Sequence, residues 1–444
     1  MMVFGYWRRK PNSLKDTHKK KKQQQLLSSN VELLIPNNFL CPISLDLMKD
    51  PVTLSTGFTY DRSNIEAWLQ AGNFTCPVTN QLLNSFDLIP NHNLRKMIQD
   101  WCVENRNFGI QRIPTPKVPV SPTEVSQLLS CLADSTRSLD QYECWDLLQK
   151  IKKWGNESER NRSCMVVNGA SSVLASTFDA FATDSFQRNA KVLEEILSIL
   201  NWMFPLDVES QIYLSSNNSL RCMLWFLRCR DLSSKQNSIS VLKELLSSDQ
   251  QHAETLASIE GVNEILYSFI KDPICPKISK DSLMVIFHLV SHPSSSENIR
   301  SSLVKMGLIS SLIEIIIDAE KSTCEKALVV FDKLCDCEEG REEAYINALT
   351  WPVLVKKILR VSAAATDYSV SAIWKLNKYG RKERVMVDVL QVGAFQKLVL
   401  VLQLGCSDET KEKATELLKQ MNPYRNNGFE CIESVDFKNL KRSF

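Results

Sequence analysis

The chain has 444 residues, of which 44% are hydrophobic and 23% are charged, and its formal net charge at pH 7 is +2. This length and apolar content predict a large folded core divided among several domains. The small net charge argues against nucleic-acid binding as the main activity. The richest apolar window, residues 308–317, is too short and too often interrupted by polar residues for a membrane span.

The first predicted segment, residues 1–33, is basic and polar. Between Arg8 and Lys22 it holds lysines and arginines with Asp16 as the one acid. We expect a disordered extension, with a nuclear import signal or a contact with anionic lipid or nucleic acid as alternatives. The segment has no apolar signal-peptide core, and the 14 cysteines of the chain then indicate a reducing compartment. We expect no disulfides and a cytoplasmic protein, with the nucleus as a second location if the basic segment is an import signal.

Residues 34–108 predict a hairpin, a helix, a long loop and a closing helix. An alternating apolar pattern flanks Gly57, a residue suited to the positive φ of a hairpin turn. A capping-box pattern at residues 63–66 predicts the start of the first helix, and Gly72 predicts its end. Apolar residues at helical spacing after residues 91–93 predict the second helix.

Zinc ligands are too few to hold this segment together. A structural zinc site uses about four Cys or His ligands, mostly in closely spaced pairs. Between Phe39 and Trp101 the sequence has only Cys41, Cys76 and His92. We therefore expect no metal. The two cysteines, each followed by proline, are expected to be small buried apolar groups, with a redox or nucleophilic role as the alternative.

Five motifs follow one another in this segment: IPNNFLCPIS, DPV, GFTYDRSNIEAWL, TCPVT and LIPNHNLRKMIQDWC. Together they resemble a U-box, the metal-free relative of the zinc-binding RING domain, and the resemblance spans residues 35–102. It implies a small α+β fold that binds a ubiquitin-conjugating enzyme charged with ubiquitin and promotes ubiquitin transfer to a substrate lysine. Such a ligase positions the loaded enzyme, so we expect no catalytic nucleophile, no cofactor and no small-molecule substrate.

The resemblance also implies which residues dock the conjugating enzyme. They are Ile43 and Leu45 of the first loop, Trp68 of the first helix and Pro77 of the second loop. Core packing is the alternative for each of them. Asn80 stands where many U-boxes carry Arg or Lys, so a charge-assisted hydrogen bond to the conjugating enzyme and its ubiquitin becomes a neutral one.

A polar network must take the place of zinc in such a domain. Six residues are candidates for it, and the sequence does not pair them: Asp46, Asp50, Tyr60, Asp61, Arg62 and Asn91. Whether two U-boxes form a dimer is also left open.

Residues 109–123 predict a Pro-rich linker, and residues 124–422 predict helical repeats. A G-x-x-x-x-L motif, or a degenerate copy of it, recurs at Gly169, Asn218, Gly261, Gly307, Thr350 and Gly393. A second helix series keeps the same step, with reference leucines at Leu200, Leu245, Leu289, Leu334, Leu376 and Leu418. The period resembles that of armadillo repeats. We expect an all-α solenoid of six or seven units, with an atypical first unit at residues 142–154 and stacking positions at Val241, Val285, Val330 and Ala372.

The last helix of each repeat is expected to form a surface that recognises a protein substrate, with a rigid spacer as the alternative. Import receptors with armadillo repeats hold peptides through recurrent asparagines. The positions before the reference leucines lack them, being Ile199, Glu244, His288, Lys333, Lys375 and Leu417. Residues 423–444 form a tail to which we assign no function.

A U-box followed by armadillo repeats resembles the plant U-box armadillo ligases, and the resemblance implies ubiquitination of regulatory targets in stress, defence or cell-death signalling. The alternative is a non-catalytic armadillo scaffold with an inactive U-box, for which Asn80 is the motive. A third hypothesis, a transport or nucleic-acid adaptor, requires salt-dependent binding through the basic extension.

Overall fold

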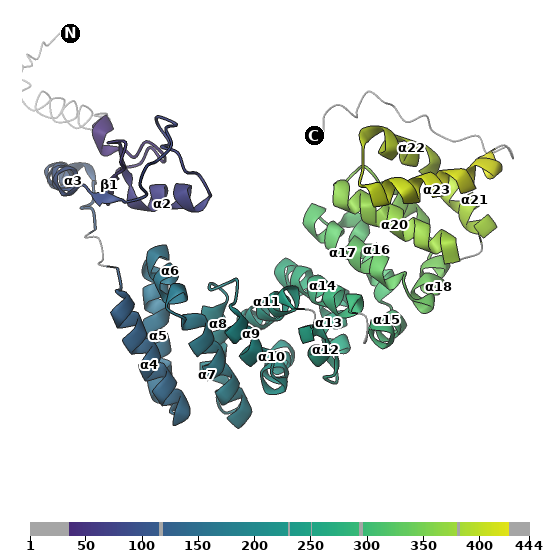
Figure 1. Ribbon diagram of the computed structural model, residues 1–444, viewed down its shortest axis with the longest axis horizontal. Helices are drawn as coiled ribbons and strands as arrows, with labels where there is room; N and C mark the ends of the chain where they lie inside the picture. Colours follow the sequence, from purple (N-terminus) through teal and green to yellow (C-terminus); the bar gives the residue numbers. More distant parts are fainter. Residues whose placement is uncertain are drawn as a thin grey trace, which may run out of the picture. The chain divides into compact units, whose positions relative to one another are not determined.

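The structure is a computed structural model that describes residues 35–114, 119–229, 231–249, 251–292, 296–379 and 382–425. The chain divides into two compact units, residues 1–118 and residues 119–444 (Figure 1). The basic extension and most of the C-terminal tail lie outside the described residues, so the predictions made for them stay predictions.

The N-terminal unit is a small three-stranded antiparallel sheet with two α-helices. Its elements are η1 (Asn37–Phe39), β1 (Pro51–Thr53), β2 (Thr59–Asp61), α2 (Arg62–Gln70), β3 (Ile89–Pro90), α3 (His92–Glu104) and η2 (Arg106–Phe108). The strand order is β2-β1-β3, and Val52 of β1 lies opposite both Tyr60 and Pro90. The sequence did not predict β3, because a two-residue strand that ends in proline has no alternating pattern to detect.

Most of the predicted turns and helix ends in this unit are confirmed. Gly57 has a φ of 83° between β1 and β2, and Gly72 has a φ of 83° just after α2. The side chain of Asn91 caps α3 by accepting a hydrogen bond from the N–H of Leu94 at 3.0 Å. Local turn chemistry therefore positions these elements as the sequence indicates.

The predicted capping box at residues 63–66 is wrong. Helix α2 begins at Arg62, and its N-cap residue is Asp61, whose side chain makes no capping hydrogen bond. The carboxylate of Asp61 instead accepts from the backbone N–H groups of Lys49 and Asp50, at 2.7 and 2.8 Å. Strand β2 leads directly into the helix. The end of the strand therefore fixes where the helix begins, and the local Ser-Glu pattern does not.

The second unit consists of stacked helices (Figure 1). It opens with a helix pair, α4 (Pro122–Arg137) and α5 (Gln141–Glu157), and continues in the described residues as six repeats of three helices. The first helices are α6 (Glu159–Val167), α9 (Val208–Leu214), α12 (Gln251–Ala257), α15 (Ser296–Lys305), α18 (Glu338–Ile346) and α21 (Lys382–Gln391). The second helices are α7 (Ala170–Ser185), α10 (Asn217–Cys229), α13 (Val262–Lys271), α16 (Leu308–Asp318), α19 (Thr350–Lys357) and α22 (Ala394–Leu404). The third helices are α8 (Ala190–Leu200), α11 (Leu232–Ser248), α14 (Pro276–Ser291), α17 (Lys321–Leu334), α20 (Ala363–Tyr379) and α23 (Asp408–Arg425).

The predicted all-α repeat architecture is confirmed, and the recurring Gly-Leu motif has a structural cause. Gly169, Gly261, Gly307 and Gly393 each precede a second helix with a φ between 79° and 94°. Their partner leucines at 174, 266, 312 and 398 are fully buried. The glycine allows the sharp turn between the first two helices, and the leucine anchors the second helix in the core.

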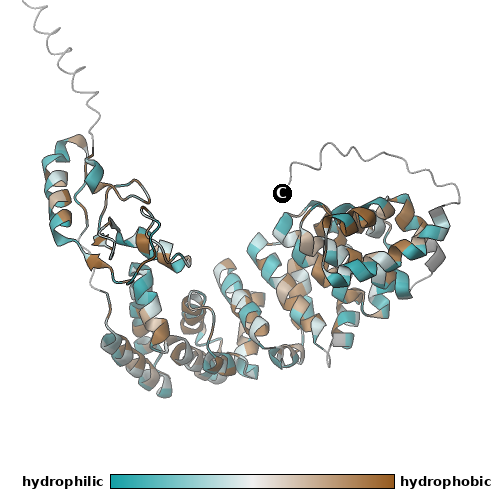
Figure 2. Cartoon of the chain, turned by 45° about the horizontal axis from the view of Figure 1, so that its top comes forward, coloured by the Kyte–Doolittle hydropathy of each residue, from teal (hydrophilic) through white to brown (hydrophobic). Residues whose placement is uncertain are grey.

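The third helices pack against one another in chain order, from α8 through α23. The predicted stacking residues Val241, Val285, Val330 and Ala372 are all fully buried. Figure 2 shows that hydrophobic and hydrophilic residues are interspersed along the helices in general, as expected when one face of each enters the core.

Two element boundaries differ from the sequence prediction. Helix α4 begins at Pro122, inside the predicted linker, and is capped by a reciprocal Ser121–Glu124 capping box. Helix α23 continues to Arg425, so Pro423 lies in its last turn and not in the tail. Pro122 is favoured at the first position of α4, because the N–H that proline lacks would have no helical partner there in any case.

Within the described residues, no single helix is long and apolar enough to cross a bilayer, and one bent pair, Val385–Gln391 with Ala394–Leu404, passes that test by length and composition only.

Candidate functional site

The first element of the candidate site is loop 1, residues 41–46, which two backbone hydrogen bonds close into a tight turn. The N–H of Leu45 donates to the carbonyl of Cys41, and the N–H of Cys41 donates to the carbonyl of Asp46, both at 2.8 Å. This closure gives Leu45 a φ of 61°, a left-handed conformation that costs a non-glycine residue about 1 kcal/mol. Leu45 is nevertheless 72% exposed, so burial of its side chain does not offset the strain.

Loop 2, residues 76–81, has the same hydrogen-bond pattern. The N–H of Asn80 donates to the carbonyl of Cys76 at 2.8 Å, and the N–H of Cys76 donates to the carbonyl of Gln81 at 2.9 Å. Asn80 has a φ of 56°, which asparagine tolerates better than most residues. Asn80 in loop 2 therefore corresponds to Leu45 in loop 1.

Helix α2 is tied to both loops. The Asn64 side-chain amide donates to the Ser44 hydroxyl of loop 1 at 2.9 Å. One turn later, the indole N–H of Trp68 donates to the carbonyl of Thr75, the residue before loop 2, at 2.9 Å. Because residues i and i+4 share one helix face, loops 1 and 2 flank the same face of α2.

Apolar side chains on both loops are accessible to a partner. Ile43 is 36% exposed and Val78 is 46% exposed, whereas Pro77 is half-buried. Ile43 and Leu45 are thus not core residues. Sequence reasoning missed Val78, because the resemblance pointed to the proline before it and only the fold of loop 2 shows which of the two side chains is more exposed.

Trp68 combines the two roles that the sequence left open. Its ring is partly buried against the core of this unit, while its position on α2 lies between the two loops. Its hydrogen bond to Thr75 makes it a connection between α2 and loop 2 as well as a part of the surface.

A second exposed apolar group lies beside loop 2 and was not predicted. Phe74, Leu82 and Phe86 are 56%, 72% and 52% exposed, and the two phenylalanine rings meet edge to face with centroids 5.7 Å apart. The N–H of Leu83 donates to the carbonyl of Phe74, which holds this group at the base of loop 2.

The predicted polar network is assembled around β2 and α2. Arg62 forms an ion pair with Asp50 at 2.6 Å, and Asp61 accepts two backbone N–H groups, as described above. The amide of Asn91 reaches the hydroxyls of Thr53 and Thr59 at 3.4 and 3.5 Å.

Asp46 contributes, in the described residues, through its backbone: its carbonyl closes loop 1 and its N–H donates to the Ser44 hydroxyl. The Asp46 bonds therefore stay within loop 1, whereas the Asn91 bonds join the hairpin to the start of α3. No group of three or more His, Cys, Asp or Glu side chains suited to a metal ion occurs in the described part of the chain.

Comparison with known proteins identifies both units. Residues 35–107 match the family described as U-box domain, and residues 124–442 match the plant U-box protein ARM repeat region. U-box domain-containing protein 21 of Arabidopsis thaliana is 48% identical over 93% of this chain and 94% of its own length.

The chain is a plant U-box protein with armadillo repeats.

Two further similarities belong with these. E3 ubiquitin-protein ligase PUB23 of Arabidopsis thaliana is 35% identical over 87% of this chain and 93% of its own length. A designed armadillo repeat protein of known structure aligns with a TM-score of 0.47 at 16% identity, covering 55% of this chain and all of its own.

Cys41 and Cys76, the two cysteines of the U-box that precede a proline, are buried hydrogen-bond acceptors. The sulfur of Cys41 accepts from the backbone N–H of Asp61 at 3.3 Å and from the amide of Asn64 at 3.4 Å. Burial alone raises the pKa of this thiol, but hydrogen bonds, above all from the Ser44 and Asp61 backbones, outweigh it and lower the pKa. The prediction of small buried groups is right about their burial but overlooks their polar role.

Ion pairs join neighbouring helices along the armadillo stack. Lys152 of α5 pairs with Glu195 of α8 at 2.8 Å, and Lys243 of α11 pairs with Asp281 of α14 at 3.0 Å. These pairs cross from one helix to the next, so they stabilise the stacking of repeats and at the same time form part of the surface.

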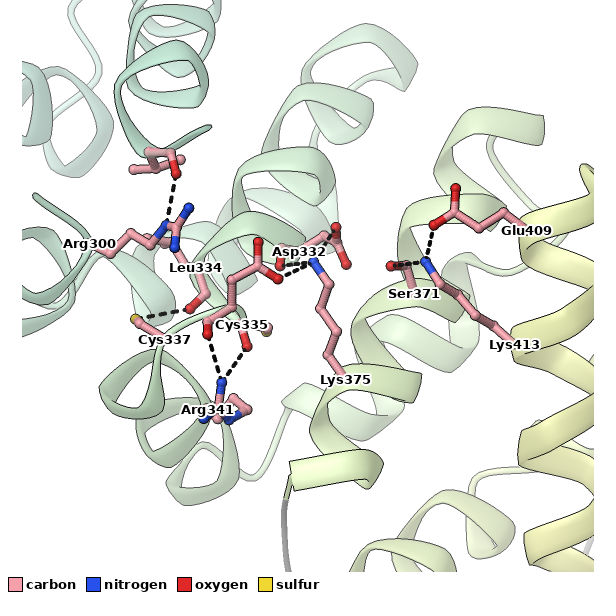
Figure 3. Close-up of polar contacts among 12 residues, drawn as sticks. Arg300, Asp332, Leu334, Cys335, Cys337, Arg341, Ser371, Lys375, Glu409 and Lys413 are labelled. Atoms are coloured by element: carbon pink, nitrogen blue, oxygen red, sulfur yellow. Dashed lines mark hydrogen bonds and ion pairs between the residues drawn. The ribbon is translucent and has the colours of Figure 1, made fainter. Parts of the chain in front are cut away.

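Lys375 is the most connected of these cations. Figure 3 shows it reaching from α20 to α17, where it pairs with Asp332 at 2.8 Å; a second pair joins it to Asp336 at 2.7 Å. On α23, the third helix of the next repeat, Lys413 donates to the Ser371 hydroxyl at 2.9 Å and pairs with Glu409. Burial raises the pKa of Asp332, although Lys375 opposes the shift.

The row of positions before the reference leucines does not form a continuous surface. Ile199 and Leu417 are fully buried, whereas Lys333 and Lys375 are partly exposed. The first five reference leucines are buried, but Leu418 is only partly buried and Leu417 lies in the core in its place. The reference position is therefore shifted by one residue in the last repeat.

Proposed function

We propose that this protein is a ubiquitin-protein ligase whose U-box docks a ubiquitin-charged conjugating enzyme. The observation that carries the proposal is the pair of matched loops on one face of α2, with a strained and exposed Leu45 at the tip of loop 1. An exposed apolar side chain held in an unfavourable conformation is expected where a partner covers it. The similarity to a protein named E3 ubiquitin-protein ligase supports the same function.

The proposed mechanism is positional. Ile43, Leu45, Trp68 and Pro77 bind the conjugating enzyme and restrict its flexible thioester-linked ubiquitin to geometries from which a lysine can attack. Ordering the reactants in this way can lower a reaction barrier by several kcal/mol, and by about 7 to 11 kcal/mol in well-oriented intramolecular reactions. The ubiquitin passes directly from the conjugating enzyme to the substrate, without a covalent intermediate on this chain.

Asn80 gives this mechanism a specific weakness. Its exposed amide can donate a hydrogen bond to the conjugating enzyme and its ubiquitin, but without a charge that bond has roughly half the strength of a charge-assisted one. We propose that activity is therefore restricted to those conjugating enzymes that bind tightly through the apolar contacts of loop 1 and α2.

The armadillo repeats are proposed to recruit the protein substrate through the polar surface of the third helices. We propose that this occurs in the cytoplasm, in plant stress or defence signalling. Dimerisation of the U-box, which the sequence leaves open, would have the exposed group of Phe74, Leu82 and Phe86 as an available surface.

A discharge assay tests the proposal. The wild-type chain is expected to accelerate release of ubiquitin from a loaded conjugating enzyme onto free lysine, and Ile43→Ala is expected to reduce that rate at least about ten-fold, since buried apolar anchors dominate such interfaces. Trp68→Ala is expected to reduce it as well. Val167→Ala is the matched control, because Val167 is 85% exposed but lies in the armadillo unit. Unchanged rates in both U-box variants would rule out the proposed docking face.

The alternative is a non-catalytic scaffold with an inactive U-box, which Asn80 favours because of its missing charge. The same assay separates the two functions, since a scaffold would not accelerate discharge with any conjugating enzyme. Asn80→Arg would then be expected to create the activity, whereas in an active ligase it is expected to increase an activity already present.

A further inference from the structure

Cys76, the first residue of loop 2, is a buried sulfur surrounded by hydrogen-bond donors. Its side chain has no exposed surface, and it lies 3.3 Å from the Thr56 hydroxyl and 3.0 Å from the Tyr60 hydroxyl. Thr79 of loop 2 also acts on this sulfur, because its backbone and its side chain both lower the pKa of the thiol. The hairpin turn and strand β2 thus each direct a hydroxyl at one atom, and loop 2 contributes Thr79.

A thiol that is surrounded by hydrogen-bond donors, with no acceptor for its own proton, is stabilised in its ionised form. Burial alone raises the pKa of Cys76, but the hydrogen bonds from Thr56, Thr79 and Tyr60 outweigh it and lower the pKa from 9.0 to about 6. Burial and the contact with Cys76 both raise the pKa of Tyr60, so the phenol keeps its proton and donates it in the hydrogen bond.

The sulfur is well placed to control loop 2. The backbone of Cys76 makes both hydrogen bonds that close the loop, to Asn80 and Gln81, and the preceding residue, Thr75, accepts the indole N–H of Trp68. A displacement of Cys76 would therefore move the loop that carries Pro77 and Asn80 and would also disturb the connection to α2.

We propose that Cys76 is a positioning residue for the docking surface: as a thiolate it gathers Thr56, Tyr60 and Thr79 and holds loop 2 in its binding conformation, and protonation of the sulfur releases the loop. This inference rests on the proposed function in that loop 2 is taken to contact the conjugating enzyme. In this proposal Cys76 does not contact the conjugating enzyme itself. It fixes the position of the loop 2 residues that do.

The groups that face the sulfur are uncharged. The hydroxyls of Thr56, Tyr60 and Thr79 and the N–H of Thr79 are the ones that shift its ionisation, and neither a carboxylate nor a cation is among them in the described residues. The Cys41 thiol acts on the same Tyr60 hydroxyl from loop 1.

The pH dependence follows from the sign of the pKa change. Since the pKa of Cys76 is lower in the folded chain than its ordinary value of 9.0, its stabilising effect is complete above about pH 9 and decreases as the pH falls, until it is lost below about pH 6. Docking is expected to weaken most steeply as the pH passes through about 6.

Two measurements on the full-length chain test the proposal. The ultraviolet absorbance of thiolate, taken as wild type minus Cys76→Ser, is expected to reveal one thiolate at neutral pH that titrates near pH 6. The dissociation constant for the ubiquitin-free conjugating enzyme that the wild-type chain activates best is expected to rise about four-fold as the pH falls from about 7.5 to about 5.5, because a group with a pKa of about 6 becomes mostly protonated over this range. Cys76→Ser is expected to bind weakly throughout that range.

Thr56→Val supplies a readout that a merely structural role would not move. Loss of one donor is expected to shift the midpoint of both titrations to higher pH, whereas Thr53→Val, which removes a hydroxyl of the same hairpin that bonds to Thr59, is expected to leave both midpoints in place. Titration of the conjugating enzyme itself cancels in the ratio of these two variants.

Absence of a thiolate signal at neutral pH, or a Thr56→Val midpoint equal to that of the wild type, would overturn the proposal. A thiolate that titrates as expected while binding does not change with pH would overturn the positioning role of Cys76 but leave the ligase function standing. If no conjugating enzyme binds at any pH, the proposed function itself fails, and the docking role of loop 2 fails with it.

Discussion

Leu45 and Asn80 occupy the same place in two loops of the same backbone conformation, yet only one of them suits that conformation. Asparagine tolerates a positive φ, whereas leucine is strained there. The strain at Leu45 has no structural benefit that we can identify, since its side chain projects into solvent. Residues whose strained conformation lowers the stability of the fold in this way are typical of binding surfaces.

Leu45→Asn is expected to separate stability from function. The change relieves backbone strain, so the U-box should gain about 0.5 to 1 kcal/mol in free energy of unfolding, while ubiquitin discharge should fall at least ten-fold because an apolar contact is lost. Hydrogen exchange of U-box amides measures the first effect, and the free-lysine discharge assay measures the second. A loss of stability together with a loss of activity would contradict this account of Leu45.

At the scale of elements, α2 connects the two loops, and ion pairs connect the armadillo helices. Asn64 and Trp68, one turn apart on α2, reach loop 1 and loop 2 respectively. In the second unit, Lys375 connects α20 to α17 through Asp332, whose second carboxylate oxygen is buried without a hydrogen-bond partner. This buried ion pair therefore adds a polar contact between two helices that also stack through Val330 and Ala372.

Lys375→Met is expected to destabilise the armadillo unit by about 3 kcal/mol, because it leaves the carboxylate of Asp332 buried without its cation. Denaturant unfolding followed by helical circular dichroism measures the change, since the repeats contain most of the helix. The double variant Lys375→Met/Asp332→Leu is expected to recover most of the loss. Lys378→Met, on the exposed side of the same helix, is the control and is expected to change stability by less than about 1 kcal/mol. Equal effects at the two lysines would show that the ion pair has no special role.

At the scale of the whole molecule, docking and substrate recruitment are proposed for different compact units, residues 1–118 and 119–444. Discharge of ubiquitin onto free lysine requires only the first unit. Modification of a protein substrate requires both units, because recruitment of the substrate raises the effective concentration of its lysines near the loaded enzyme.

A chain shortened to residues 1–118 is therefore expected to retain discharge onto free lysine within about two-fold and to lose modification of protein substrates that the full chain modifies. Discharge and substrate assays run side by side measure the two activities, with the Ile43→Ala form of the short chain as the inactive control. Retained substrate modification by the short chain would mean that the armadillo repeats do not recruit the substrate.

Much of the fold was predictable from local patterns. Gly57, Gly72 and Asn91 mark turns and a cap through chemistry that acts over a few residues, and the armadillo period is visible because four of the six repeats place a positive-φ glycine before a buried leucine in the same way. The start of α2 was not predictable, because Asp61 is recruited by backbone groups more than ten residues earlier in the chain.

The sequence by itself determined the two kinds of domain, their order, the repeat period and the loops that were candidates for docking, because these depend on spacing along the chain. Only the tertiary structure decided which loop residues are exposed, that loops 1 and 2 share one backbone conformation, how the polar network is paired, and that Thr56, Tyr60 and Thr79 meet at Cys76. Burial, ionisation and hydrogen bonding depend on neighbours in space, and in this U-box those neighbours come from segments that the chain brings together only when it folds.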